Sequence, residues 1–287
     1  MELKLQGIEH DFGKKRILKN INFTMSPGVY GLLGPNGTGK TTLMRIVADV
    51  LYPTRGKVLL NEQNKEEIGD LYRAQIGYLP QDLGMYNHFS ARDFLHYVAA
   101  LKGISKKEAG DRIEVLAQTV NLSGEMDKKC GKYSGGMKRR LGIAQALLNH
   151  PSILILDEPT VGLDPLERVR FRNLISEISA ERIVILSTHI VSDVDHIAKQ
   201  VLLMGRGELL RQGTIKDLTS DLEGEVWEAT VPGRMLAQVE EKGTVVNVQQ
   251  TDTGVAIRVV STDPPCENAR LVIPSLEDVY MHYFRRG

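Results

Sequence analysis

The sequence predicts an α/β fold, in which a parallel sheet is covered by helices on both faces and a small α+β module follows. Three observations support this prediction. Short apolar runs alternate with segments of helical spacing between residues 29 and 187, as in a parallel sheet with crossover helices. A glycine-rich loop at residues 34–41 joins one strand to a helix. Beyond about residue 220 strands dominate until a final helix.

The elements follow from periodicity. Apolar residues alternate with polar ones in the first 33 residues, which predicts half-buried strands at 3–8 and 21–25 before a buried strand at 29–33. The same reasoning predicts a helix after residue 42, strands at 57–60 and 76–80, helices between 91 and 120, a helix at 135–149, a strand at 153–156, a helix at 166–178 and a strand at 183–187. We place the first domain at residues 1–220, with a helical subdomain at about 84–150.

The second predicted domain covers residues 221–287. Its predicted elements are strands at 226–231, 245–249, 255–260 and 269–273, a short helix at 235–240 and a closing helix at 276–284. The closing helix carries an apolar stripe of Leu276, Val279, Tyr280 and Tyr283. This stripe either docks against the same module of a partner or packs inside its own small domain.

Composition excludes several classes of protein. The 287 residues are 42% hydrophobic and 25% charged, with 36 basic and 36 acidic side chains. A net charge of zero argues against a bulk nucleic-acid binder. No apolar run approaches the roughly 18 residues that cross a bilayer, and the start lacks the apolar stretch of a signal peptide. Two distant cysteines, Cys130 and Cys266, favour a reduced cytosolic protein without structural disulfides.

The glycine-rich loop fits the phosphate-binding pattern GxxxxGK followed by Thr. Glycines let backbone N–H groups surround phosphate oxygens, and the helix that begins there adds the positive end of its dipole. Lys40 supplies charge to the β- and γ-phosphates, and the Thr41 hydroxyl suits Mg²⁺. The candidate nucleotide-binding residues in this loop are Gly34, Asn36, Gly37, Gly39, Lys40, Thr41 and Thr42.

Two further segments carry chemistry. The apolar strand at 153–156 ends in Asp157 and Glu158, at the edge where ligands of parallel sheets bind. Asp157 is placed to hold Mg²⁺ and Glu158 to orient or deprotonate a water. Ser134, Gly135 and Gly136 open a helix, and its N-terminus makes a second anion site.

Together these motifs resemble the nucleotide-binding subunit of ATP-binding cassette (ABC) transporters. The loop matches the Walker A motif, residues 153–158 match Walker B with its catalytic glutamate, and 133–137 correspond to the family signature LSGGQ. Gln81 matches the Q-loop glutamine, a further Mg²⁺ contact, Asp164 lies in the D-loop, and His189 matches the switch histidine. Phe12 stands where the family stacks an aromatic on adenine. The resemblance covers roughly residues 1–220 and implies a P-loop NTPase core with a mixed sheet and a helical subdomain.

The resemblance assigns roles residue by residue. Lys40, Gln81, Glu158 and His189 are the expected catalytic residues, and ATP and Mg²⁺ the expected ligands. Taken singly, His189 would be an ordinary core or turn residue, Gln81 a turn residue and Phe12 a core residue. Tyr133 and Met137 replace the usual Leu and Gln of the signature, without loss of a charge. The residues at 133–140 and at 274–280 resemble the corresponding segments of the subfamily whose membrane partners are of the ABC-2 export type.

The resemblance also implies partners. Two cassettes, identical or different, pair head to tail, and a separate membrane-spanning permease supplies the pore. The subunit then lies at the cytoplasmic face of the membrane, and Gln81 with residues 82–103 is the expected permease contact. No nucleic-acid partner is expected.

Two other interpretations of the function remain open. The first is a soluble ABC ATPase acting on ribosomes or DNA. It is disfavoured by the single cassette and by the 93 residues (134 − 41), without sustained heptads, between Thr41 and Ser134. The second is a non-enzymatic, nucleotide-gated regulator, which would need neither Glu158 nor His189.

Overall fold

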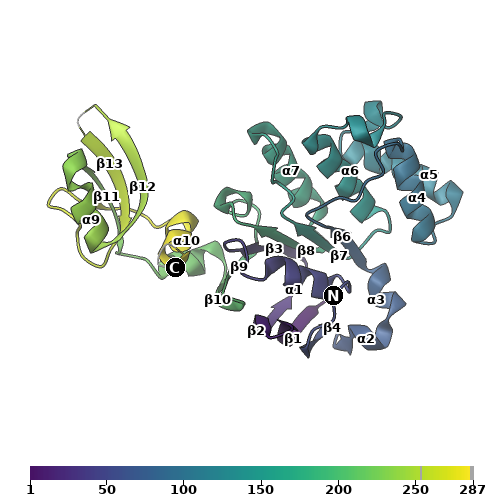
Figure 1. Ribbon diagram of the computed structural model, residues 1–287, viewed down its shortest axis with the longest axis horizontal. Helices are drawn as coiled ribbons and strands as arrows, with labels where there is room; N and C mark the ends of the chain where they lie inside the picture. Colours follow the sequence, from purple (N-terminus) through teal and green to yellow (C-terminus); the bar gives the residue numbers. More distant parts are fainter. Residues whose placement is uncertain (253, 285–287) are drawn as a thin grey trace.

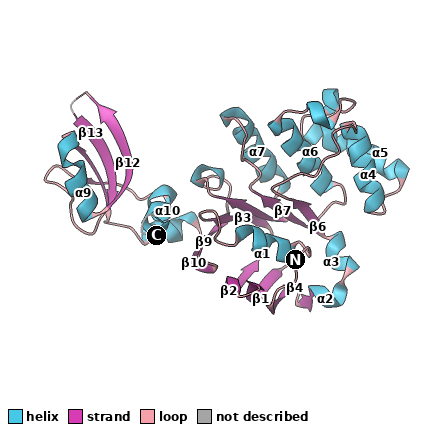
Figure 2. Cartoon of the chain, viewed as in Figure 1, coloured by secondary structure: helices cyan, strands magenta, loops and turns pink. Residues whose placement is uncertain are grey.

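The structure is a computed structural model that describes residues 1–252 and 254–284. Two sheets and their helices form the main body, and a third, smaller sheet stands beside it (Figure 1). Figure 2 shows helices gathered above the central sheet and on the side away from the third sheet. Residue 253 and residues 285–287 of the predicted second domain lie outside the described residues.

The central sheet confirms the predicted parallel arrangement and explains where the site lies. Its strands, in the order β10-β9-β3-β8-β7-β6, are β10 (Glu208–Gly213), β9 (Gln200–Gly205), β3 (Gly28–Leu33), β8 (Ile183–Thr188), β7 (Ile153–Asp157) and β6 (Ile76–Leu79). Neighbours from β9 to β6 are parallel, and β10 is antiparallel to β9, so the sheet is mixed. Leu33 pairs with Thr188 and Asp157 with Ser187, so β3, β7 and β8 end side by side.

The first strands of the chain form a separate antiparallel sheet in the order β2-β1-β4-β5. They are β1 (Leu3–Phe12), β2 (Lys15–Met25), β4 (Arg55–Leu60) and β5 (Gln63–Asn64). Helix α1 (Lys40–Val47) shares a core with this sheet and the central sheet, where its residues Met44 and Ile46 are at most 1% exposed. The amphipathic pattern of α1 therefore fixes the loop that precedes it against two sheets.

The remaining helices of the main body are α2 (Lys65–Ile68), α3 (Asp70–Ala74), α4 (Ala91–Leu101), α5 (Lys106–Thr119), α6 (Gly135–Leu147), α7 (Pro165–Ile178) and α8 (Ile215–Ser220). Helices α4, α5 and α6 contact one another and form the predicted helical region. Five of these helices begin at a side chain that accepts the N–H of the third helical residue: Ser90, Ser105, Ser134, Asp164 and Thr214. Helix α6 ends at Leu147, two residues before the predicted end.

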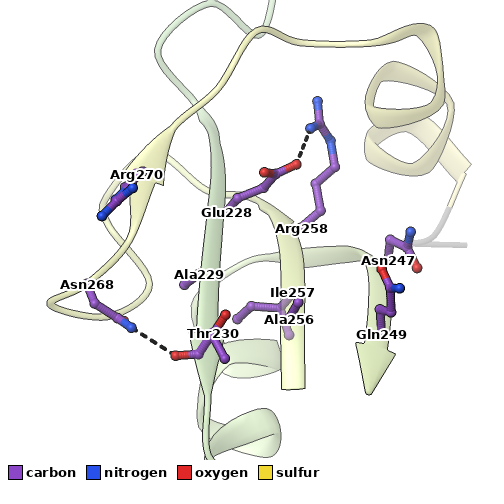
Figure 3. Close-up of a pocket in the computed structure, with 10 residues that line it drawn as sticks. All are labelled: Glu228, Ala229, Thr230, Asn247, Gln249, Ala256, Ile257, Arg258, Asn268 and Arg270. Atoms are coloured by element: carbon purple, nitrogen blue, oxygen red, sulfur yellow. Dashed lines mark hydrogen bonds and ion pairs between the residues drawn. The ribbon is translucent and has the colours of Figure 1, made fainter. Parts of the chain in front are cut away.

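The third sheet is antiparallel, in the order β12-β13-β11-β14, and its strands are β12 (Thr244–Thr251), β13 (Gly254–Val260), β11 (Val226–Val231) and β14 (Arg270–Leu271). Helix α9 (Leu236–Lys242) covers one face, where Val239 belongs to the same buried apolar cluster as Val255 and Ile257. The other face is polar and lines an open pocket of about 500 Å³ (Figure 3). Glu228 and Arg258 form an ion pair of 2.7 Å within it.

The closing helix α10 (Leu276–Phe284) packs on its own domain and also on the main body, so the apolar stripe is not confined to the small domain, and docking on a partner stays a prediction. Leu276 and Val279 are at most 1% exposed and belong to the core of the main body, together with Leu218 of α8. Helix α10 contacts α8 and the 3₁₀ turn η3 (Val191–Asp193) as well as β12 and β13. The stripe therefore covers the junction between the main body and the third sheet, because apolar side chains from both sides meet there.

A buried ion pair attaches α10 to the third sheet. Arg258 of β13 donates from Nε and Nη2 to the Asp278 carboxylate at 2.8 and 2.7 Å, and from Nη2 to the Ile273 carbonyl at 2.8 Å. Asp278 is fully buried and also accepts from the Ser275 N–H and hydroxyl at 2.7 Å. The predicted boundary between residues 220 and 221 stays a prediction, since this helix packs on both sides of it.

Candidate active site

The phosphate-binding loop lies between β3 and α1, as predicted. Gly37 and Gly39 have φ of 81° and 103°, a region that side chains other than glycine rarely adopt. A Cβ on Gly34 would stand 2.2 Å from the Met204 carbonyl oxygen of β9. The loop sequence is therefore required by its own backbone path and by its contact with the neighbouring strand.

Lys40 is folded over this loop. Its side chain is nearly buried, and Nζ donates to the carbonyl oxygens of Gly34 at 2.6 Å and Pro35 at 2.9 Å. Burial lowers the pKa of the Lys40 ammonium, and the carboxylates of Glu158 and Asp157 oppose that shift. The acidic pair and the loop lysine are thus close enough to interact electrostatically.

Asp157 ends β7 and is fully buried. Its Oδ1 accepts from the Ser187 hydroxyl at 2.7 Å and from the Thr41 hydroxyl at 3.3 Å. Its Oδ2 is buried with no hydrogen-bond partner among the described residues, which is unusual for a carboxylate oxygen. A hydroxyl beside a carboxylate with a free oxygen is a ligand set that fits Mg²⁺.

Glu158 lies at the centre of the predicted catalytic residues. Its Oε2 accepts from Gln81 Nε2 at 3.2 Å, and its Oε1 lies 3.3 Å from His189 Nδ1. Its backbone N–H donates to the Ser187 hydroxyl at 2.9 Å. The backbone of Glu158 is left-handed, with φ of 46°, and such strain in a residue other than glycine is concentrated at functional sites.

Four predicted residues from three loops therefore meet at one edge of the sheet: Gln81 after β6, Asp157 and Glu158 at the end of β7, and His189 after β8. Charged oxygens, amide donors and an imidazole in this arrangement can bind a cation and orient a water molecule beside a phosphate.

The signature segment lies elsewhere, at the start of α6. The Ser134 hydroxyl accepts from the Met137 N–H at 3.2 Å, and Gly135 faces the Gly162 carbonyl. Asp164 accepts from the Glu167 N–H at 2.8 Å and so caps α7. In the described part of the chain, no hydrogen bond or ion pair joins these residues to the phosphate-binding loop.

Phe12 ends β1 with 54% of its surface exposed, and its ring contacts the His10 ring at 4.5 Å between centroids. This exposure excludes the alternative that Phe12 is a core residue. An exposed aromatic face is available for stacking.

Sequence reasoning missed the second layer of the site. Ser187 holds Asp157 and the Glu158 backbone, and Asp193 accepts hydrogen bonds from Thr160 and Thr188. One signal was present in the sequence: hydroxyl side chains directly follow the apolar part of β8, at residues 187 and 188. Such residues at the end of a buried parallel strand need partners from neighbouring strand ends and loops.

The fold and the site define a P-loop ATPase, with a phosphate-binding loop facing a buried acidic pair at the ends of parallel strands. The chain belongs to the ABC transporter family, whose model matches residues 18–161.

Known proteins agree with this assignment. The chain is 35% identical to the uncharacterized ABC transporter ATP-binding protein YxlF of Bacillus subtilis, over 84% of this chain and 80% of that protein. It is 38% identical to the bacitracin transport ATP-binding protein BcrA of Bacillus licheniformis, over 73% and 69%. The solved structure of cbiO1 from Clostridium perfringens, part of the ABC transporter complex cbiONQ, superposes with a TM-score of 0.68 at 27% identity, over 76% of this chain and 90% of that one.

The chain is thus an ATP-binding subunit of an ABC transporter and hydrolyses ATP to drive transport. ABC ATP-binding proteins work as dimers with membrane permease partners. Among the described residues, none of the helices has the length and apolar character to span a bilayer.

Proposed function

We propose that this subunit powers export through a separate ABC-2-type permease, and that it closes on a second cassette when ATP binds. The observation that carries the catalytic part is the contact of Glu158 with both Gln81 and His189, at 3.2 and 3.3 Å. Glu158 orients and deprotonates the attacking water, and His189 fixes the carboxylate. Lys40 balances charge on the β- and γ-phosphates, because its ammonium lies at the loop that surrounds them.

Mg²⁺ fits beside the acidic pair. Thr41 and Asp157 are the residues that would hold it, since their oxygens already lie 3.3 Å apart and Asp157 Oδ2 has no partner among the described residues. Gln81 supplies an amide oxygen from the adjacent loop. When bound, the ion neutralises phosphate charge and aligns the β- and γ-phosphates. Phe12 stacks on adenine with its exposed ring.

A second cassette completes the site. Ser134, Gly135 and Gly136 open α6, where the first N–H groups of a helix have no partner within the helix, and that anion site lies outside the group formed by Glu158, Gln81 and His189. Head-to-tail pairing brings the signature segment of one chain onto the phosphates held by the other. Each ATP is then enclosed between two chains, which excludes bulk water from the reaction.

The permease contact includes Gln81 and residues 82–103. Tyr86, Tyr97 and Leu101 there are 44%, 39% and 70% exposed, and Tyr86 packs on Phe89 and Tyr97 with ring centroids 5.1 and 5.6 Å apart. Aromatic side chains of this kind are enriched at protein interfaces. The subunit is then held at the cytoplasmic face of the membrane. The relatives include a Nod factor export ATP-binding protein of Rhizobium sp., 32% identical to this chain, which supports export as the direction of transport.

Mixing two inactive variants tests the pairing. Lys40→Ala removes the charge of the phosphate loop. Gly135→Asp places a carboxylate at the signature, where a Cβ has room because its nearest neighbour is the Gly162 oxygen at 3.8 Å, and an acidic residue favours a helix N-terminus. Each variant alone should lose ATP turnover. A 1:1 mixture should recover about a quarter of the parent rate, since half of the pairs contain one intact composite site out of two.

The control is a mixture of differently tagged Lys40→Ala and Gly135→Asp proteins, in which co-purification of the two tags reports whether the subunits exchange. Exchange without recovery in the mixture of the two variants would refute composite sites.

A further inference from the structure

A buried carboxylate outside the catalytic residues connects two of their loops. Asp193 ends η3 and is fully buried. Its Oδ2 accepts from the Thr160 hydroxyl at 2.5 Å and from the Thr188 hydroxyl at 3.0 Å. Its Oδ1 is buried and has no partner among the described residues. A buried carboxylate costs free energy that an apolar residue of similar size would avoid.

The two threonines hold catalytic loops. Thr160 follows Glu158 by two residues, across Pro159, and Thr188 directly precedes His189. Both are at most 1% exposed, so their hydroxyls have few alternatives to this carboxylate. The Thr188 hydroxyl also accepts from the Ile190 N–H at 2.9 Å, which ties the loop after His189 back onto the strand end.

The strained backbone of Glu158 needs support from its surroundings. A left-handed φ in a side chain other than glycine persists only where neighbouring contacts hold it. The Ser187 hydroxyl holds the Glu158 N–H from one side at 2.9 Å. The bond from Thr160 to Asp193 restrains the chain that leaves Glu158 on the other side.

We propose that Asp193 is a positioning residue for ATP hydrolysis. It fixes the loops after β7 and β8 relative to each other, and so keeps Glu158 Oε1 next to His189 Nδ1, which lie 3.3 Å apart. The inference rests on the proposed catalytic roles of Glu158 and His189. Among the described residues, the Asp193 carboxylate accepts hydrogen bonds from the Thr160 and Thr188 hydroxyls and from no residue of the phosphate-binding loop, so it acts on the chemical step rather than on ATP binding.

The test compares Asp193→Ala with Asp193→Asn in the full chain. Asp193→Ala should lower kcat for ATP about 10- to 100-fold with little change in KM, because misplacement of a reacting group by about 1 Å costs up to 100-fold. Asp193→Asn keeps an oxygen that accepts from both hydroxyls and should retain most of the parent kcat. The matched control is Asp195→Ala, two residues away. The Asp195 side chain is 36% exposed, and its contact with His196, at 4.0 Å, is a weak one. This variant should change neither kcat nor KM.

Steady-state ATP turnover, equilibrium nucleotide binding and the thermal midpoint are measured together. Parent-like kcat in a folded Asp193→Ala protein would overturn the inference, as would a rise in KM at constant kcat. If Asp193→Ala fails to fold, Thr160→Val and Thr188→Val replace it, because each removes one hydroxyl and keeps a similar side-chain shape. Both variants should show the same loss of kcat. An unchanged kcat in both would also overturn the inference. Normal turnover in Glu158→Gln would instead refute the proposed function, so the two failures are distinguishable.

Discussion

Glu158→Gln provides the most direct test of the catalytic site, because the structure predicts that the variant folds. The neighbours of the side chain suit an amide as well as a carboxylate. Gln81 Nε2 donates to Oε2 at 3.2 Å, so the amide oxygen can take that place. The amide nitrogen then takes the place of Oε1, which lies 3.3 Å from His189 Nδ1. The imidazole nitrogen can accept a hydrogen bond from it in one of the two tautomers of the ring. No buried polar group loses its partner, and we expect the thermal midpoint to change little.

The loss is therefore chemical. An amide cannot take a proton from water, and general-base catalysis contributes about 10²–10⁴-fold to rate. That range corresponds to about 2.7–5.5 kcal/mol of transition-state free energy. ATP affinity should be retained, since Lys40 and the backbone N–H groups of the loop are untouched. Closed pairs should accumulate, because hydrolysis no longer opens them.

Three measurements check this prediction: ATP turnover with Mg²⁺, equilibrium ATP binding, and sedimentation with and without ATP. Lys40→Ala is the contrasting variant, in which nucleotide binding itself should weaken. Turnover of Glu158→Gln within about threefold of the parent would remove Glu158 from the role of general base.

Two further predictions concern other parts of the chain. Phe12→Ala should raise KM for ATP by an amount equivalent to about 1–3 kcal/mol, as for base–aromatic stacking, whereas Phe12→Tyr should be nearly silent; unchanged ATP affinity in the folded Ala variant would contradict stacking. Burial raises the pKa of Asp278, but the hydrogen bonds from Arg258 and Ser275 outweigh it and hold that pKa below its ordinary value. The stabilisation by this pair is therefore complete above the unfolded pKa of about 3.9 and is lost as pH falls through the lower folded pKa. Thermal unfolding can be followed between pH 6 and acid by the fluorescence of Trp227, the single tryptophan, and should report that loss. An Asp278→Asn variant with the same acid sensitivity as the parent would refute the assignment of this loss to Asp278.

Much of the fold follows from local pattern. The strand at Val226–Val231 and the helix at Leu276–Phe284 have the predicted bounds, because alternating and helical apolar spacing have different periods. The strands β9 and β10 were not predicted, although Val201–Met204 is a buried apolar run. Nor does spacing reveal that β1, β2, β4 and β5 form a sheet of their own, since strand pairing depends on contacts distant in sequence.

The site divides in the same way. Asp157, Glu158, Gln81 and His189 all follow predicted strands, and parallel strands bring their carboxyl ends to one edge. Asp193 follows Ile190 and Val191 in a short 3₁₀ turn, where no periodicity marks it as buried. Its importance depends on which hydroxyls reach it, and that is a property of the folded loops alone.

The place of α10 in the main core has a consequence for the order of folding. Leu276 and Val279 complete an apolar cluster that also contains Leu218 and Val194, so parts of the chain more than 50 residues apart (276 − 218 = 58) must meet. During synthesis, the apolar surface of α8 and η3 stays open to solvent until the closing helix emerges from the ribosome. At about 5–20 residues per second, that interval lasts several seconds. The nascent ATPase therefore depends on helix α10 to bury a surface that would otherwise promote aggregation.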